Sequence, residues 1–150
     1  MAYTAIDDPE AYFQVKIYTG TGSSNAITLD GDTDMQPDFV WGKQRNGTNQ
    51  NHLHDAVRGV TKRLRSDSND AEDTQAEGLK SFDSDGFTMG TASFVNASDD
   101  TYVAWCWKES ATSGFDIVTY TGNATARTIS HSLSAVPHFY VVKSLDTDGL

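Results

Sequence analysis

Three tryptophans are the residues of this sequence whose chemistry best suits ligand binding. They are Trp41, Trp105 and Trp107. An exposed indole ring offers an apolar face that can stack on a sugar, whereas a buried ring builds a core. Trp105 and Trp107 stand two positions apart in an apolar run, so in a strand they share one face. One face of that strand must form the core, and the other is either a second packed layer or a binding platform. We treat all three tryptophans as candidate carbohydrate-binding residues.

Two histidines with the same spacing are the next candidates. His52 and His54 fall on one face of an expected strand. With Asp55 beside them they could hold a metal ion, but a third ligand at suitable spacing is missing. Histidines are also common on protein surfaces. We therefore place both histidines among the candidate carbohydrate-binding residues rather than among metal ligands.

Asp30, Asp32 and Asp34 resemble the start of a calcium-binding loop. An EF-hand would require glycine at the sixth loop position and glutamate at the twelfth, where this sequence has Met35 and Trp41. The EF-hand is therefore excluded, and a looser Ca²⁺ site on a β-loop is the alternative to a solvated loop. We expect no metal site and no cofactor, with Ca²⁺ as the weak exception.

Catalytic motifs are missing from the sequence. It contains neither a Gly-x-Ser-x-Gly nucleophile turn nor a glycine-rich phosphate loop before a helix. Asp83 and Asp85 flank Ser84 in a stretch whose composition favours a turn, so we interpret these carboxylates as turn-forming. We expect no catalytic residues and no enzyme activity. The alternative is a glycosidase, which would place two carboxylates across a cleft.

The charge balance disfavours nucleic acid as a partner. The 150 residues carry 11 basic and 21 acidic side chains, for a net charge of −10, and such a surface repels phosphates. The single basic cluster is Arg58, Lys62, Arg63 and Arg65. It could bind an acidic glycan or an acidic partner, but we expect a solvated strand face that balances the carboxylates following it.

Composition also limits the location of the chain and its covalent chemistry. Hydrophobic residues make up 37% of the sequence, and no window approaches the roughly 18 to 20 apolar residues of a membrane-spanning helix. The first four residues lack the basic and apolar regions of a secretory signal. Cys106 is the only cysteine, which rules out an intrachain disulfide, and its apolar surroundings predict a buried, unreactive thiol.

Short apolar runs separated by turn residues predict an all-β fold. Residues 13–18, 39–41 and 101–108 have strand chemistry, and glycine and asparagine-rich stretches lie between them. Residues 51–64 could form a helix, but we favour two strands, at 52–58 and 60–65, broken at Gly59. The expected architecture is an antiparallel β-sandwich.

The beginning of the chain has a partial second copy near its end. FQVKIYTG at 13–20 matches FDIVTYTG at 115–122, and PDFVWGK at 37–43 matches PHFYVVK at 137–143. This similarity predicts a sandwich unit with a short N-terminal arm at residues 1–112 and the start of a second unit at 113–150. The second part either completes the first unit by pairing with its sheet, or belongs to a longer repeat protein. In both cases it should pack on its own domain or on a neighbouring chain.

Several phrases of the sequence, taken together, resemble a known repeated domain. They are YTG at 18–20, PDFVW at 37–41, HDAVRG at 54–59, SFDSDGFT at 81–88 and YVAWCWK at 102–108. The resemblance covers residues 10 to 150 and is to an uncharacterised domain of virion proteins, such as tail and fibre proteins, of marine bacteriophages. It implies a concanavalin-like jelly-roll in a tail fibre, appendage or head decoration, and it supplies no catalytic residues.

From that resemblance we expect a virion structural protein that binds host surface glycans. Its partners would be other virion proteins and further copies of itself, with a trimer favoured, but neither nucleic acid nor an inserted membrane. The alternatives are a connector or cement subunit without a ligand and, with less support, a glycan-degrading enzyme.

Overall fold

The computed structural model describes residues 6–146, so residues 1–5, where we expect no secretory signal, and 147–150, the end of the expected second unit, lie outside it. The elements are η1 (Pro9–Ala11), β1 (Phe13–Thr19), β2 (Asn25–Thr28), β3 (Phe39–Gln44), β4 (His52–Asp55), β5 (Lys62–Arg63), β6 (Asp73–Thr74), β7 (Leu79–Asp83), β8 (Gly86–Met89), α1 (Ser93–Asn96) and β9 (Thr101–Trp107). None of the helices in this described part has the length and apolar character needed to cross a membrane.

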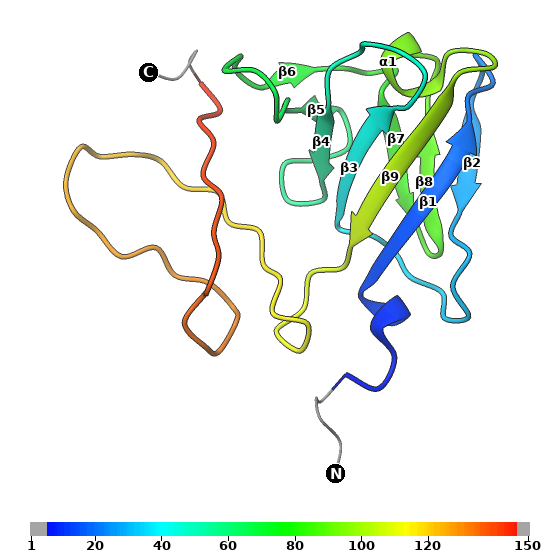
Figure 1. The fold of residues 1–150 in the computed structure, drawn as a ribbon. Coiled ribbons are helices and arrows are strands. Elements are labelled where there is room, and N and C mark those ends of the chain that lie inside the picture. The colour runs from blue at the N-terminus through cyan, green and yellow to red at the C-terminus, as the bar shows by residue number, and fades with distance from the viewer. Residues whose placement is uncertain (1–5, 147–150) are drawn as a thin grey trace.

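Two antiparallel sheets face each other and make the body of the molecule (Figure 1). The larger sheet has the order β1-β9-β3-β4 and the smaller has the order β2-β8-β7, while β5 and β6 form a separate short pair. Every strand pair is antiparallel. The predicted all-β antiparallel sandwich is thus confirmed, and the jelly-roll topology stays a prediction.

The core lies between the sheets and is built from alternate residues of each strand. β9 supplies Tyr102, Ala104 and Cys106, all fully buried. Tyr18 of β1 stacks on Tyr102, with ring centroids 5.2 Å apart, and its hydroxyl donates to the Val95 carbonyl at 2.9 Å. The face of β9 without tryptophan is therefore the core face. The remaining buried apolar residues of this cluster are Ile27, Leu29, Met35, Val40, Leu79, Phe87, Met89, Val95.

Cys106 lies in this core as a free thiol. Burial raises the pKa of its thiol to about 12, so at neutral pH the side chain is protonated and a poor nucleophile. This environment agrees with the prediction of a buried, unreactive cysteine.

The strands expected at 52–58 and 60–65 are present but shorter. β4 ends at Asp55, whose carboxylate accepts a hydrogen bond from the Arg58 backbone N–H at 2.8 Å and pairs with the Arg58 guanidinium at 2.5 Å. These two bonds close a turn directly after the strand. Gly59 follows with φ +101°, a backbone angle that residues other than glycine rarely adopt. β5 then comprises only Lys62–Arg63.

After β9 the chain leaves the sandwich and makes a long open loop at its side (Figure 1). Residues 116–146 contain neither helix nor strand. The loop is held at its two ends, first by a bridge between Ser110 and Phe115. At the far end, Lys143 Nζ donates to the Ser68 carbonyl at 3.0 Å, and the Leu145 carbonyl accepts from the Glu72 N–H at 2.9 Å. Similarity to β1 and β3 is therefore not enough to make strands of 115–122 and 137–143 in this chain.

Candidate functional site

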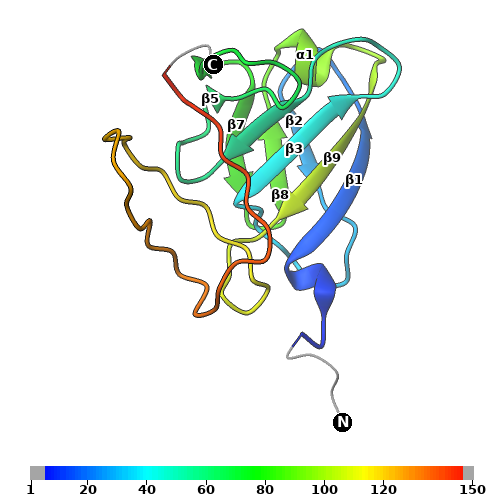
Figure 2. The ribbon, with the colours of Figure 1, turned by 60° about the vertical axis from the view of Figure 1, so that its left-hand side comes forward.

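The outer face of the four-stranded sheet, which Figure 2 shows in front of the smaller sheet, carries aromatic side chains in register. Strand pairing aligns them in two rows, Phe13–Trp107–Phe39 and Val15–Trp105–Trp41. We call these six residues the aromatic face. The outer face of an antiparallel sandwich is ordinarily polar. A contiguous apolar surface of this kind marks a place where a ligand or another polypeptide binds.

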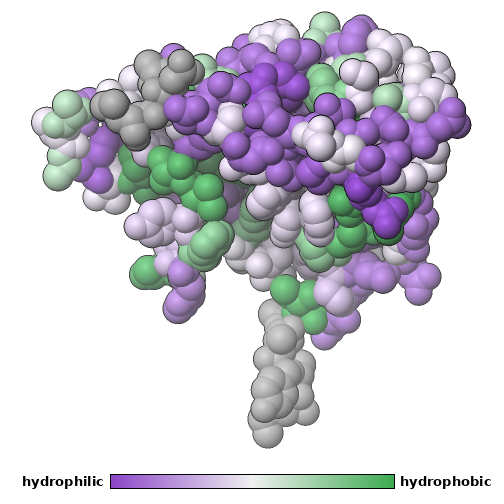
Figure 3. Space-filling view, turned by 45° about the horizontal axis from the view of Figure 1, so that its top comes forward, coloured by the Kyte–Doolittle hydropathy of each residue, from purple (hydrophilic) through white to green (hydrophobic). Residues whose placement is uncertain are grey.

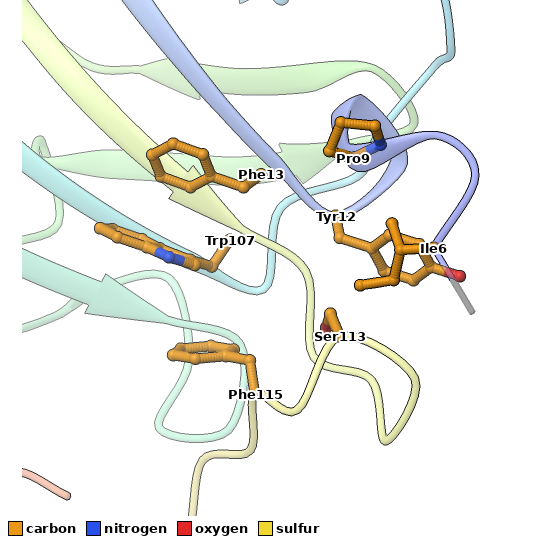
Figure 4. Close-up of a pocket in the computed structure, with 7 residues that line it drawn as sticks. All are labelled: Ile6, Pro9, Tyr12, Phe13, Trp107, Ser113 and Phe115. Atoms are coloured by element: carbon orange, nitrogen blue, oxygen red, sulfur yellow. The ribbon is translucent and has the colours of Figure 1, made fainter. Parts of the chain in front are cut away.

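The first row is covered by the ring of Phe115, which belongs to the C-terminal segment (residues 113–146 of the described chain). Trp107 lies between Phe13 and Phe115 (Figure 4), with ring centroids 4.9 Å and 6.1 Å away. Phe115 also packs on Phe39 at 5.9 Å. The backbone of Phe115 is fixed by two hydrogen bonds to Ser110, of 3.0 and 3.2 Å. Trp107 is therefore packed against aromatic rings of its own chain on both sides, and a ligand can reach mainly its edge.

A hollow of about 230 Å³ opens beside this stack (Figure 4). Its wall is predominantly apolar, and it joins the N-terminal arm to the loop that follows β9. The residues around it are Ile6, Pro9, Tyr12, Phe13, Trp107, Ser113, Phe115. It can accept a small apolar group next to the aromatic face.

The second row leaves its tryptophans more accessible. Trp41 and Trp105 meet edge to face, with centroids 6.1 Å apart, and both side chains are partly exposed. The Trp41 indole N–H donates to Asn51 Oδ1 at 3.3 Å, which holds the ring in place. Val15 at the end of the row is 47% exposed. The structure thus brings all three candidate tryptophans onto one face, and that face is the outer one.

The two candidate histidines lie on the opposite, inner face of the same sheet. His52 and His54 are 1% and 0% exposed, so no sugar reaches them in this structure and their assignment to a carbohydrate site is wrong. The physical reason is strand alternation: β4 pairs with β3 so that His52 lies opposite Gly42 and His54 opposite Val40, both of which face the core.

Burial also determines the charge state of these histidines. It lowers the pKa of His54 to about 4 and takes the pKa of His52 well below its usual value, so both rings are neutral at pH 7. The Nε2 atoms of both rings are buried, and neither has a hydrogen-bond partner among residues 6–146. The His52 ring instead packs edge-on against Phe94, with centroids 5.3 Å apart.

Asp30, Asp32 and Asp34 do not converge on a common point. The Asp30 carboxylate pairs with Lys16, and the Asp32 backbone N–H donates to Glu10 Oε2 at 2.9 Å. Within residues 6–146 no three side chains of the types His, Cys, Asp and Glu are grouped as metal ligands. The weak Ca²⁺ candidates therefore gain no support from the geometry.

Asp30 nevertheless contributes to a second shallow hollow, also of about 230 Å³, at the edge of the aromatic face. Glu10 and Asp30 line it together with Phe13 and Val15. The Gln14 amide lies at its base, where it accepts from the Gly31 N–H at 2.9 Å and donates to the Glu10 carbonyl at 3.0 Å. Polar groups beside an apolar platform are the combination that a sugar requires.

All four side chains of the basic cluster form ion pairs within the chain. The pairs are Arg58–Asp55, Arg58–Glu72, Lys62–Glu72, Arg63–Asp73, Arg65–Asp70 and Arg65–Asp73. The predicted charge balance with neighbouring carboxylates is confirmed, but the face is not solvated, because the side chains of Arg58, Arg63 and Arg65 are only 6%, 11% and 15% exposed. This pairing leaves little positive charge for an acidic partner.

One carboxyl pair at the exit of β9 was missed from the sequence. Glu109 and Asp116 share a hydrogen bond, which raises the pKa of Glu109 to about 7, with burial adding to the shift, and lowers the pKa of Asp116. Carboxyl groups in a glycosidase stand about 5 Å or more apart, on either side of the sugar bond. Two carboxyl groups that are hydrogen-bonded to each other leave no room for a glycosidic bond between them. The one sequence signal for this pair is that Glu109 and Asp116 flank the turn that precedes Phe115.

Comparison with known proteins gives a family and no function. Residues 8–149 match DUF7483, a domain family of unknown function, and the chain belongs to that family. The match runs through both the sandwich and the C-terminal segment. No curated protein and no solved structure matches the chain.

Proposed function

We propose that the chain is a structural protein of a bacteriophage virion and that its aromatic face binds host surface glycans. The sequence resemblance to virion proteins of marine phages supports the first part. It points to a tail fibre, an appendage or a head decoration assembled in the bacterial cytoplasm. The proposed partners are other virion proteins and further copies of the chain, with a trimer favoured. The proposal includes no catalysis, no cofactor, no nucleic acid and no membrane insertion.

The observation that carries the glycan proposal is the outward position of Trp41 and Trp105. Partly exposed indole rings on a rigid sheet need little reorganisation to stack on a flat sugar ring. The neighbouring hollow adds the Glu10 and Asp30 carboxylates, which can accept hydrogen bonds from sugar hydroxyls. Apolar stacking and polar recognition are thus available within one surface.

A glycan array probed with the full chain tests this proposal. Trp105→Ala should weaken binding to any recognised glycan by about tenfold or more, because truncation of a central aromatic residue typically costs over 1.4 kcal/mol. Val136→Ala is the control, since Val136 is apolar and exposed but belongs to no strand of the sheet. Absence of any binding, or binding that survives Trp105→Ala, would overturn the glycan proposal.

A connector role is the second candidate, and the C-terminal segment favours it. Figure 3 shows hydrophobic surface at the side of the molecule, whereas the end of the sandwich nearest the viewer is mostly hydrophilic. In the described part of the chain, the most exposed large apolar side chains belong to that segment, namely Val136, Phe139, Tyr140, Val141, Val142. Side chains of this kind belong in an interface. Imaging of purified particles that locates this chain would test the virion part of both candidates.

A further inference from the structure

The C-terminal segment repeats the two strands that flank β9. β1 and β3 both pair with β9, one on each side, and both run antiparallel to it. Residues 115–121 match β1 in sequence, and residues 139–143 match the first five residues of β3. The connection between the matched parts is also similar in length, 122–138 in the segment and 20–38 in the sandwich. The segment thus holds the sequence of the two outer strands of a three-strand group.

The matched positions differ sharply in burial. Tyr18 is 8% exposed, whereas its counterpart Tyr120 is 48% exposed. Val40 is fully buried, whereas its counterpart Tyr140 is 81% exposed. Apolar residues therefore occupy core-facing positions of a sheet that is not formed.

The element that residues 6–146 do not supply to this segment is a counterpart of β9. In residues 6–146, β9 has both of its edges hydrogen-bonded, to β1 and to β3, so it cannot also pair with the segment. Two strands of a sheet that are separated by a third lie about 10 Å apart, too far for direct hydrogen bonds. Among residues 6–146, no strand lies between 115–121 and 139–143 to pair with both of them, which explains why neither is a strand here.

We propose that residues 115–143 form a docking site for one β-strand from outside this chain, which inserts between 115–121 and 139–143 as β9 does between β1 and β3. Backbone hydrogen bonds on both edges would supply affinity, as in strand-addition complexes. The register of the first unit defines the chemistry of the partner. Its core-facing residues would be of the kind seen in Tyr102, Ala104 and Cys106, aromatic or small.

The outward residues of the partner strand follow from the same register. They would meet Phe115, Ile117, Phe139 and Val141, the counterparts of Phe13, Val15, Phe39 and Trp41, and should be apolar. The inference extends the connector role and names its partner as an apolar strand. It does not depend on glycan binding by the aromatic face, so either proposal can fail without the other.

A peptide with the β9 sequence is the direct probe. We would use residues 98–109 with Cys106→Ser, labelled at the N-terminus, because Asp99, Asp100 and Glu109 keep it soluble. Titrated into the full chain, it should bind saturably, and amide hydrogen exchange at 115–121 and 139–143 should slow by about tenfold or more. Exchange in β1, β3 and β9 should not change.

A double variant identifies the binding position. Val118→Asp with Val142→Asp places charges at core-facing positions of the proposed site, and both residues are exposed in the free chain. It should reduce peptide affinity by about tenfold or more without changing protection of the sandwich. The matched control is Ile17→Asp, on the outer face of β1. Protection confined to 13–19, with loss of binding in Ile17→Asp, would mean that the peptide adds to the free edge of β1 and would overturn the inference.

A tethered form provides the second measurement if the free peptide self-associates. The same residues, joined after Leu150 by a Gly/Ser linker, should raise the β content of the chain and slow exchange at 115–121. Unchanged circular dichroism and unchanged exchange in the tethered chain would overturn the proposal.

Discussion

β1 and residues 115–121 have related sequences and different structures. Both begin with phenylalanine and end in Tyr-Thr, yet β1 is an ordered strand and its counterpart is not. β1 has β9 along one edge and the smaller sheet over one face, whereas its counterpart has neither. Alternation of apolar residues is therefore not sufficient to form a strand. The segment must also pair with a neighbouring strand along one edge and pack one face against another layer.

The largest difference should appear at the two matched tyrosines. Tyr18→Ala removes a ring that stacks on Tyr102 and a hydroxyl bonded to the Val95 carbonyl, and should lower the free energy of unfolding by about 3 to 5 kcal/mol. Tyr120→Ala should change it by less than about 0.5 kcal/mol. Urea unfolding followed by tryptophan fluorescence measures both. An equal loss of unfolding free energy in Tyr18→Ala and Tyr120→Ala would mean that the C-terminal segment folds as part of the sandwich.

Acid should destabilise the sandwich through its two buried histidines. The pKa of His54 falls from about 6.5 unfolded to about 4 folded because of burial, and that of His52 is also lowered. The unfolded chain then binds more protons below pH 6.5, so stability present above that pH is lost as pH falls. His54 alone accounts for about 3 kcal/mol by pH 4.

The exposed histidines of the C-terminal segment provide the control for this pH dependence. His131→Gln with His138→Gln should leave the decline between pH 6.5 and 5 unchanged, because both residues are exposed in the folded chain. Chemical unfolding at a series of pH values measures the slope. A flat profile in that window would refute the assignment to His52 and His54.

A smaller effect is expected at Gly42 of β3 and its larger counterpart Val142. A Cβ at Gly42 would lie 2.7 Å from His52 Nε2 and 2.9 Å from its Cδ2, so Gly42→Ala should cost about 1 to 3 kcal/mol through overpacking. Val142, at the matched position of the segment, is 66% exposed, and Val142→Ala should be nearly neutral. Thermal unfolding of the two variants compares them, and a neutral Gly42→Ala would show that the His52 ring can move.

The smallest effect should appear at the junction between the two regions. The hydrogen bond with Asp116 raises the pKa of Glu109 to about 7, so this contact is present at low pH and is lost as pH rises through 7. Phe115, which packs on Trp107, should then loosen, and tryptophan fluorescence should change between pH 6 and 8. In Glu109→Gln that change should disappear. Its persistence would place the titrating group elsewhere.

Much of the fold follows from the sequence because strand alternation and turn residues are local signals. They predicted an all-β sandwich, strands at the positions of β1 and β9 and the turn around Ser84. They could not show which side of β1 faces the core. Its apolar residues Phe13, Val15 and Ile17 lie outside, while Gln14 is buried because its amide bonds the backbone of Glu10 and Gly31.

The site was predictable in part for the same reason. Spacing placed Trp105 and Trp107 on one face, and Trp41 joined them through pairing of β3 with β9. The same spacing placed His52 and His54 together but could not show that their face is the buried one. The contribution of Phe115 depends on a chain reversal after β9, which composition does not encode.

Hydrogen exchange of the full chain, resolved by segment, tests the central claim most directly. We predict strong protection in residues 13–19, 39–44 and 101–107, and exchange close to that of an unstructured chain in 117–122 and 137–142. Protection at 117–122 and 137–142 equal to that of β1 and β3, in the chain without added peptide, would contradict the claim that these residues lack their central strand.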